Sequence, residues 1–238
     1  MYEMSEIEFS KYASRGPGYH WSQVSLNPRT RNAFVLARYR ACCDLLGEYA
    51  GELEGRTVLD LGCGDGVLTS MLAQRGALCR GVDLDESAVM FAREKLASLG
   101  LAADLVVGSC YDLQFDDRSF DAVVSSEVVE HVGDVQRYLS EIARVLRQDG
   151  IAVISTPVRR TRTPSDPMHV QEWFEEDFKE LCEGTFSSVE LRLSHATVAA
   201  ELYRSRIGRW AINAMSYFYN PFRLGNSGSQ ALQFAICR

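Results

Sequence analysis

The chain has 238 residues, 46% of them hydrophobic, and a formal net charge of −7. This composition excludes global disorder and argues against a broad basic face, so no nucleic-acid partner is expected. The seven cysteines are odd in number and show no zinc-type spacing, and no signal-like segment or run of about 18 apolar residues is present. A reduced, cytoplasmic protein is therefore expected.

The predicted elements alternate between short apolar strands and helices. After an irregular stretch over 1–27, a helix is expected from Asn27-Pro28 to about Tyr49. Strands are then expected at 57–61, 78–83, 102–107, 120–125 and 151–155, with helices at 67–74, 86–99 and 135–146. This alternation predicts a parallel sheet with helices on both faces.

Beyond Pro157 the alternation loosens, with a helix expected at 175–182, a strand at 189–194, a helix at 203–217 and a strand at 231–237. We expect an N-terminal cap over 1–50. A cofactor-binding domain is expected over 51–238, with a substrate-lid insert at about 196–228.

A glycine-rich turn follows the first strand, in the sequence Asp60–Gly66. Glycines let a ligand approach the backbone, and the helix that follows offers free N–H groups. Asp83 ends the next strand about 20 residues later, the spacing at which an acid reaches ribose hydroxyls. The pattern predicts a cofactor that contains a nucleoside.

The nature of that cofactor is indicated by what surrounds the glycines. A dinucleotide fingerprint would need a third glycine where Val67 stands. The carboxylates of Asp60 and Asp65 would repel a pyrophosphate, but they suit the ammonium and sulfonium of S-adenosylmethionine (SAM).

At this point the sequence resembles the class I SAM-dependent methyltransferases. The matching motifs are 58–66, 81–83, 120–124 and 145–150. The resemblance implies a Rossmann-like, doubly wound α/β fold with seven strands, the last antiparallel, an N-terminal helical cap and a late helical insert. It also implies that Asp83 holds the ribose and that Leu84 packs on the adenine. Tyr111 and Asp112 would flank the adenine, with Asp112 near its amino group, and Ser126 would lie near the methionine. The full set of expected cofactor residues is Asp60, Gly62, Cys63, Gly64, Asp83, Leu84, Tyr111, Asp112, Ser126 and Arg31.

A cluster of acids and a histidine follows the fourth strand. Glu127, Glu130 and His131 stand at i, i+3 and i+4, so they would share one face if the segment is helical. One interpretation makes His131 a general base that deprotonates a hydroxyl acceptor. The other makes Glu127, Glu130, His131 and the later His169 ligands of a divalent cation such as magnesium or manganese. A third interpretation needs no metal, because acids in a first helical turn also stabilise the helix.

The Glu127-x-x-Glu130-His131 pattern is similar to that of the ubiquinone-biosynthesis O-methyltransferases, and the segment 219–225 resembles one in the same enzymes. Asn27-Pro28 with Arg29 or Arg31 resembles their N-terminal cofactor-binding arginine. The small-RNA 2′-O-methyltransferases share the pattern and add a downstream histidine that His169 could match. This acidic chain, however, lacks an evident RNA surface.

An apolar stripe near the C-terminus is formed by residues at helical spacing, namely Ile207, Trp210, Ala211, Ala214 and Phe218. Such a stripe predicts a helix that packs on the core or forms a lid over the substrate pocket. The alternative is a helix that contacts a membrane, over about 204–223, and collects a lipid-like substrate.

Taken together, the sequence predicts a SAM-dependent methyltransferase that acts on a hydroxyl of a small molecule, such as a sugar, phenol, polyketide or quinone-like metabolite. N-methylation of a small-molecule amine is the main alternative. A nicotinamide-dependent oxidoreductase and a non-catalytic SAM-binding protein are the others. The oligomeric state stays open.

Overall fold

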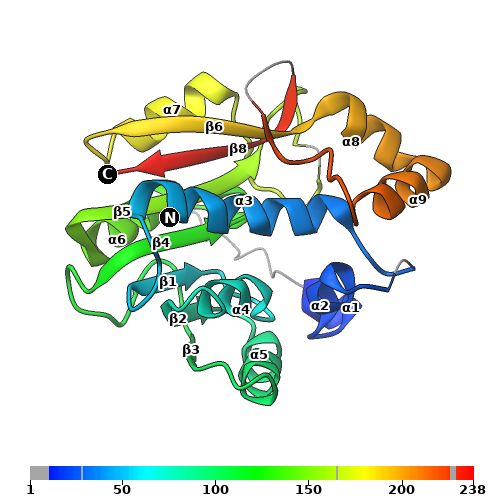
Figure 1. Ribbon diagram of the computed structural model, residues 1–238. Coiled ribbons are helices and arrows are strands. Elements are labelled where there is room, and N and C mark those ends of the chain that lie inside the picture. Colours follow the sequence, from blue (N-terminus) through cyan, green and yellow to red (C-terminus); the bar gives the residue numbers. More distant parts are fainter. Residues whose placement is uncertain (1–10, 28, 165, 226–228) are drawn as a thin grey trace.

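The computed structural model describes residues 11–27, 29–164, 166–225 and 229–238. At its centre is a sheet whose strands lie in the order β3-β2-β1-β4-β5-β8-β6-β7 (Figure 1). The strands are β1 Thr57–Leu61, β2 Leu78–Asp83, β3 Ala103–Val107, β4 Phe120–Ser126, β5 Leu146–Pro157, β6 Val189–Ala196, β7 Leu224–Gly225 and β8 Gln230–Cys237.

The pairing of these strands confirms the predicted fold class. The strands β1 to β5 are parallel to one another, whereas β8 runs antiparallel to both of its neighbours, β5 and β6. The two-residue β7, which pairs with β6, adds an eighth strand to the seven that were expected. The strand order reverses between β1 and β4, where open α/β sheets bind their ligands.

Helices cover both faces of the sheet. The helices α3 Ala33–Ala50, α4 Val67–Ala73 and α5 Glu86–Ser98 pack on one face, and α6 Val135–Val145 and α7 Glu175–Glu183 on the other (Figure 1). Because side chains alternate along a strand, neighbouring residues of the central strands enter opposite cores. Val123 thus contacts the α6 and α7 side, and Val124 the α3 and α4 side.

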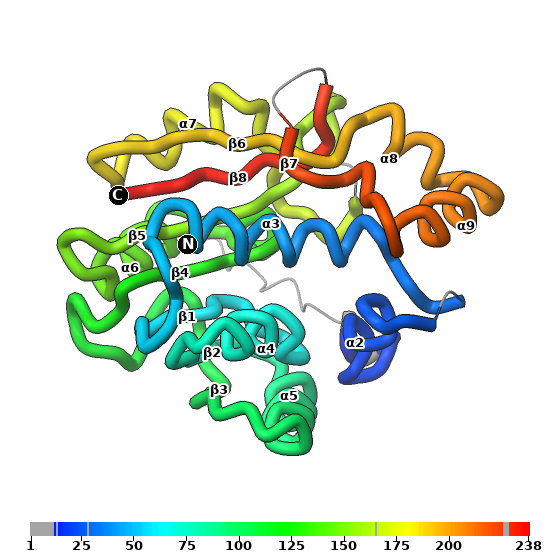
Figure 2. The backbone as a smooth tube through the Cα atoms, in the orientation of Figure 1, coloured from blue at the N-terminus to red at the C-terminus, as the bar shows by residue number. Residues whose placement is uncertain are grey.

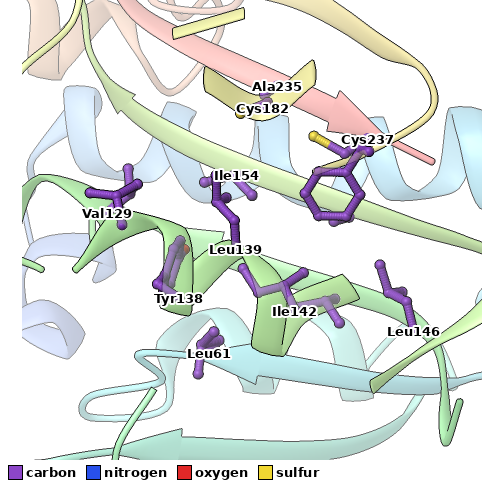
Figure 3. Close-up of a cluster of buried hydrophobic side chains, with 14 of the residues drawn as sticks. Leu61, Val129, Tyr138, Leu139, Ile142, Leu146, Ile154, Cys182, Ala235 and Cys237 are labelled. Atoms are coloured by element: carbon purple, nitrogen blue, oxygen red, sulfur yellow. The ribbon is translucent and has the colours of Figure 1, made fainter. Parts of the chain in front are cut away.

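The core beneath α6 shows why this helix forms where it does. Its buried residues Tyr138, Leu139 and Ile142 recur at helical spacing and face the sheet, and Asp134 caps its first turn by accepting a hydrogen bond from Arg137 N. Figure 3 shows them against Leu61 and Ile154, with Cys182 of α7 beside Ala235 and Cys237 of β8.

The N-terminal segment is more ordered than the sequence predicted. Within the described residues of 1–27, α1 Lys11–Arg15 and α2 Tyr19–Val24 are short helices. The helix α3 begins at Ala33, not at Asn27, because the Asn32 side chain accepts hydrogen bonds from the first free N–H groups. Pro28 lies outside the described residues.

Two further expected elements differ. The single helix expected at 203–217 is a pair, α8 Thr197–Arg204 and α9 Arg206–Met215, because Ser205 is extended and caps α9 through Gly208 N. The strand β5 begins five residues earlier than expected, at Leu146. Figure 2 traces α8, α9 and α2 along the edge where the parallel strands end, which is the ligand edge of the sheet.

Candidate functional site

The glycine turn lies at the carboxyl end of β1 and needs glycine for steric reasons. Gly62, Gly64 and Gly66 all have positive φ, at 78°, 50° and 79°. A Cβ atom on Gly62 would lie 2.2 Å from the side chain of Val128, and one on Gly64 would lie 1.9 Å from the hydroxyl of Tyr12. The turn is therefore a cradle that no larger residue could form.

Asp83 is fixed at the end of β2 by two backbone groups. Its Oδ2 accepts a hydrogen bond from Gly64 N (2.8 Å) and its Oδ1 one from Asp85 N (2.9 Å). Burial raises the pKa of this carboxyl group despite both bonds. Each carboxylate oxygen can accept a second hydrogen bond, so the group can still bind a diol. Leu84, beside it, is 67% exposed, which suits a surface that a flat ring would cover.

Asp60 lies beneath the turn and not on its surface. It is buried, and its Oδ2 accepts a hydrogen bond of 2.6 Å from Thr69 Oγ1 in α4. Burial raises the pKa of Asp60 to about 7. In this structure Asp60 ties β1 to α4. Cys63, in the turn above, is buried against α5.

The N-terminal helices close over the turn through Asp65. Its Oδ2 accepts a hydrogen bond from His20 N (2.7 Å), and its backbone carbonyl accepts one from Trp21 Nε1 (2.6 Å). The hydroxyl of Tyr12 accepts one from Asp65 N (3.3 Å). No signal in the sequence pointed to Tyr12, which belongs to a five-residue helix.

The loop after β3 is expected to hold the adenine. Asp112 borders a cavity of about 320 Å³, together with Val82, Val107, Gly108 and Ser109 among others. Tyr111 turns towards α6, where its hydroxyl accepts hydrogen bonds from Gly133 N (2.7 Å) and Asp134 N (3.2 Å). Asp112 therefore borders a cavity that could hold a ligand, whereas Tyr111 binds the segment that precedes α6.

The segment after β4 is not an α-helix. Only Val129–His131 forms one turn, a 3₁₀-helix, and Glu127 has a left-handed backbone with φ of 59°. The common helical face expected for Glu127, Glu130 and His131 does not form. Positive φ in a non-glycine residue costs free energy and is often found at functional sites.

Glu127 instead points to the cap helix α3. Its Oε2 lies 3.3 Å from Arg38 Nη1, and both side chains are largely buried. Burial opposes the charge on Arg38, but the nearby carboxylate outweighs it and raises the pKa of the guanidinium. Arg38 Nε and Glu127 Oε1 have no hydrogen-bond partner. The neighbouring Ser126, at the end of β4, accepts a hydrogen bond from Ser155 Oγ (3.3 Å). Arg38 Nε and Glu127 Oε1 are thus two polar atoms without a partner, and Glu127 is next in sequence to Ser126, the residue expected near the methionine.

Glu130, His131 and His169 do come together. One potential ligand atom from each lies within 4.8 Å of the others. Hydrogen bonds from Val170 N (2.8 Å) and Gln171 N (3.3 Å) to Glu130 O hold the loop that carries His169 in place. The loop thereby brings together residues that are 38 positions apart in the chain.

The atoms of this trio are oriented for a ligand. Glu130 is fully buried; its Oε2 accepts a hydrogen bond from Thr156 Oγ1 (3.1 Å), but its Oε1 has no partner. Burial, and then the charge of Glu127, raise the pKa of Glu130 well above its usual value. A bound cation would stabilise the ionised form of this buried carboxyl group, so the unpaired Oε1 of Glu130 fits a cation ligand.

The two histidines are held through Nδ1. His131 Nδ1 lies 3.0 Å from Met168 O, and His169 Nδ1 lies 2.6 Å from Glu172 Oε1. A carbonyl oxygen can only accept, so the bond to Met168 places the proton of neutral His131 on Nδ1 and the lone pair on Nε2. A carboxylate behind a histidine is the usual support of a metal ligand. The rings lie 5.0 Å apart.

Arg31 occupies a different position from the one its motif implied. Its Nε donates to Ser216 Oγ (2.9 Å), its Nη1 donates to Ser25 O (3.1 Å), and its guanidinium lies 4.4 Å from the centre of the Tyr217 ring. In this structure Arg31 joins the cap to the segment after α9. No contact described for it reaches the glycine turn.

The fold and the residues at the ligand edge of the sheet define a class of protein. It is a doubly wound α/β protein with a glycine-rich turn at the switch point and, after the next strand, an acid placed to bind ribose. In comparison with known proteins, residues 59–154 match the family model described as a methyltransferase domain. Over this part the chain is similar to SAM-dependent methyltransferases.

Curated relatives agree with that assignment. The chain is 35% identical over 155 residues to a probable S-adenosylmethionine-dependent methyltransferase of Mycolicibacterium smegmatis, covering 62% of this chain and 59% of the relative. It is 35% identical over 112 residues to a ubiquinone biosynthesis O-methyltransferase of Rhizobium leguminosarum, covering 47% and 44%. The matched region thus spans about half the length of these relatives.

Solved structures share the fold at low identity. Phosphoethanolamine N-methyltransferase 2 of Haemonchus contortus, in complex with SAM, has a TM-score of 0.70 at 18% identity over 97% of this chain and 58% of that one. The cyclase SpnF has a TM-score of 0.67 at 18% identity, covering 95% and 92%. One fold thus carries different reactions, so the acceptor chemistry must be argued from the site.

Proposed function

We propose that the protein transfers the methyl group of SAM to a hydroxyl of a small molecule, such as a sugar, phenol, polyketide or quinone-like metabolite. The observation that carries this proposal is the convergence of Glu130, His131 and His169 next to the glycine turn. Val128, two residues before Glu130, packs on Gly62 of that turn, so the trio adjoins the cofactor cradle.

SAM fits the cradle by shape and by charge. The glycines admit the backbone approach that a nucleoside needs, and Asp83 is oriented towards the turn by Gly64 N. The Asp83 carboxylate at the turn suits the positive charge of the cofactor, whose sulfonium makes the methyl group electrophilic. Leu84 and Asp112 are proposed to contact the adenine, and Ser126 the methionine. Positioning two reactants in line supplies much of the rate in such a transfer.

A hydroxyl acceptor must lose its proton as it attacks the methyl group, and the trio offers a group for this. The orientation of His131 by Met168 O leaves Nε2 as the basic atom, so His131 is proposed as the general base. In the alternative, Glu130, His131 and His169 would hold a divalent cation such as magnesium or manganese, which would lower the pKa of a bound hydroxyl. Nε2 of His131 would then be a ligand of the cation and not the base. Glu127, paired with Arg38, would be a neighbour of that cation and not a ligand.

N-methylation is the second candidate, because one protein that shares this fold, phosphoethanolamine N-methyltransferase 2 of Haemonchus contortus, is named for that activity. A neutral amine needs less help from a base than a hydroxyl does, so N-methylation would leave less for the trio to do. The oriented histidines therefore favour oxygen. A nicotinamide oxidoreductase is disfavoured by Val67 at the third glycine position and by the carboxylates around the turn.

The test begins with titration calorimetry of the full chain against SAM and NAD, in which SAM alone should bind. Methyl transfer to a panel of sugars, phenols and amines is then read by mass spectrometry and NMR. The proposal predicts methyl ethers, and N-methyl products alone would refute it.

Variants separate the two roles of the trio. His131→Ala should lower turnover by about 10²-fold or more, with SAM affinity retained. A cation requirement predicts that chelation and Glu130→Gln each lower turnover and that magnesium restores only the chelated wild type. The exposed Glu52→Gln is the matched control. Activity that survives both chelation and Glu130→Gln would remove the cation from the proposal.

A further inference from the structure

The helix α9 is inverted relative to the usual amphipathic arrangement: hydrogen-bonding side chains face the protein. Buried Asn213 accepts a hydrogen bond from Ala33 N (3.0 Å) and donates one to Arg31 O (2.6 Å). Ser216, also buried, accepts from Arg31 Nε (2.9 Å). These bonds fix which side of the helix faces the cap.

The apolar stripe of α9 consequently faces outward. Ile207 is 81% exposed, Trp210 70% and Phe218 97%. Ala211 and Ala214 lie between them at helical spacing and are exposed as well. We call these five residues the α9 face. Contiguous exposed apolar surface of this kind marks a site of interaction.

The charge around the α9 face is opposite to that of the rest of the chain. Residues 197–225 contain one acidic residue, Glu201, and four exposed arginines, which gives a net charge of +3; the arginines are Arg204, Arg206, Arg209 and Arg223. The whole chain carries −7, so everything outside this segment carries −10. The positively charged segment, which includes α8 and α9, lies at the ligand edge of the sheet (Figure 1).

We propose that the α9 face docks on the surface of a bilayer that contains anionic lipids. In that arrangement Ile207, Trp210 and Phe218 enter the boundary between headgroups and acyl chains, and the arginines contact the anionic headgroups. Tryptophan and tyrosine favour this boundary, and Tyr217 and Tyr219 flank the stripe. No helix in the described part of the chain is long and apolar enough to cross a membrane, so α9 lies in the plane of the interface.

Charge distinguishes this occupant from a second copy of the chain. A symmetric dimer through the α9 face would bring together two segments of +3, and the repulsion would oppose association. An anionic bilayer instead attracts this segment and repels the acidic remainder, which orients the molecule. The proposal extends beyond the methyl transfer proposed above and does not depend on the acceptor. Docking in this way would place the acceptor edge next to the lipid phase.

The test is flotation of the full-length protein with vesicles of phosphatidylcholine alone or with about one third phosphatidylglycerol. We expect binding to the anionic vesicles that high salt weakens. Trp210→Ala/Phe218→Ala should lower the partition coefficient at least about tenfold. Arg206→Glu/Arg209→Glu should lower it by at least about 25-fold, since each lost cation costs about fivefold.

Matched controls change the same properties elsewhere. Met90→Ala on α5 removes an exposed apolar side chain, and Arg56→Glu/Lys179→Glu changes the net charge by the same amount as the arginine pair. Both should bind like the wild type, and thermal unfolding of every variant checks the fold. Equal binding by the α9 variants and the controls would overturn the proposal. So would concentration-dependent dimers in sedimentation velocity that Trp210→Ala/Phe218→Ala abolishes, because the face would then be a self-association surface.

Discussion

The pair formed by Arg38 and Glu127 gives the sharpest prediction about stability. The two charges lie 3.3 Å apart, and their side chains are only 8% and 17% exposed. Arg38→Met keeps most of the side-chain volume but leaves the carboxylate with no cation. Removing one partner of a buried pair costs about 3 kcal/mol or more, because the other charge stays desolvated. For a chain of this size the loss corresponds to a fall in melting temperature of about 6–12 °C.

Urea unfolding, followed by circular dichroism, measures this loss against a surface control. Arg75 and Asp44 also form a pair, at 2.6 Å, but their side chains are 39% and 60% exposed, so Arg75→Met should cost less than about 1 kcal/mol. Adding Glu127→Leu to Arg38→Met should recover much of the loss, since no buried charge remains. The reasoning is refuted if Arg38→Met is as mild as Arg75→Met, or if the double variant loses the sum of both single changes.

Three further predictions concern the turn, the buried acid and α9. Gly64→Ala should abolish SAM binding in calorimetry, since the added Cβ would meet Tyr12 and the φ of this residue is positive. The control Gly100→Ala has open space around its Cβ, so it should cost about 1 kcal/mol of stability and leave the affinity for SAM intact. Asp60 has a pKa of about 7 in the folded state, above its unfolded value, so folding favours the protonated carboxyl group. The stability of the wild type relative to Asp60→Asn should therefore fall as pH rises from about 4 to about 7. Equal differences between the two proteins in urea unfolding at pH 5 and pH 8 would contradict this. Asn213→Leu should cost about 2 kcal/mol and speed amide exchange in α9, because it removes the donor to Arg31 O and leaves Ala33 N with only its longer bond to the Tyr203 hydroxyl. Unchanged exchange would argue against this anchor.

The central sheet was predictable because its signals are local. The strands β1 and β2 begin and end where the sequence predicted, since each is a short apolar run that ends at a glycine turn or an acid. The glycines of the cradle and Asp83 were found for the same reason. Their types and spacing are set by the backbone geometry of one turn, so the motif carries the information by itself.

The differences arise where distant residues decide the local structure. No helical pattern in the sequence predicted α2, since this helix is held by a contact between Trp21 and Asp65, 44 positions away. The turn after β4 contains good helix formers, yet Glu127 has a left-handed backbone; its N–H donates to Ser155 O on the next strand and its carboxylate pairs with Arg38. Pattern alone could not predict these contacts, since tertiary interactions override propensity.

The α9 stripe shows the same limit in its functional consequence. Its periodicity predicted a helix correctly for most of its length, but periodicity cannot say which side faces the protein. That choice follows from Asn213 and Ser216, whose hydrogen bonds to the segment around Arg31 would be left buried and unpaired if the helix turned by half a revolution. The cost of orphaning several such groups exceeds what burying a few apolar side chains on this small cap would return. In the part of the chain that the structure describes, the apolar side of α9 therefore faces outward.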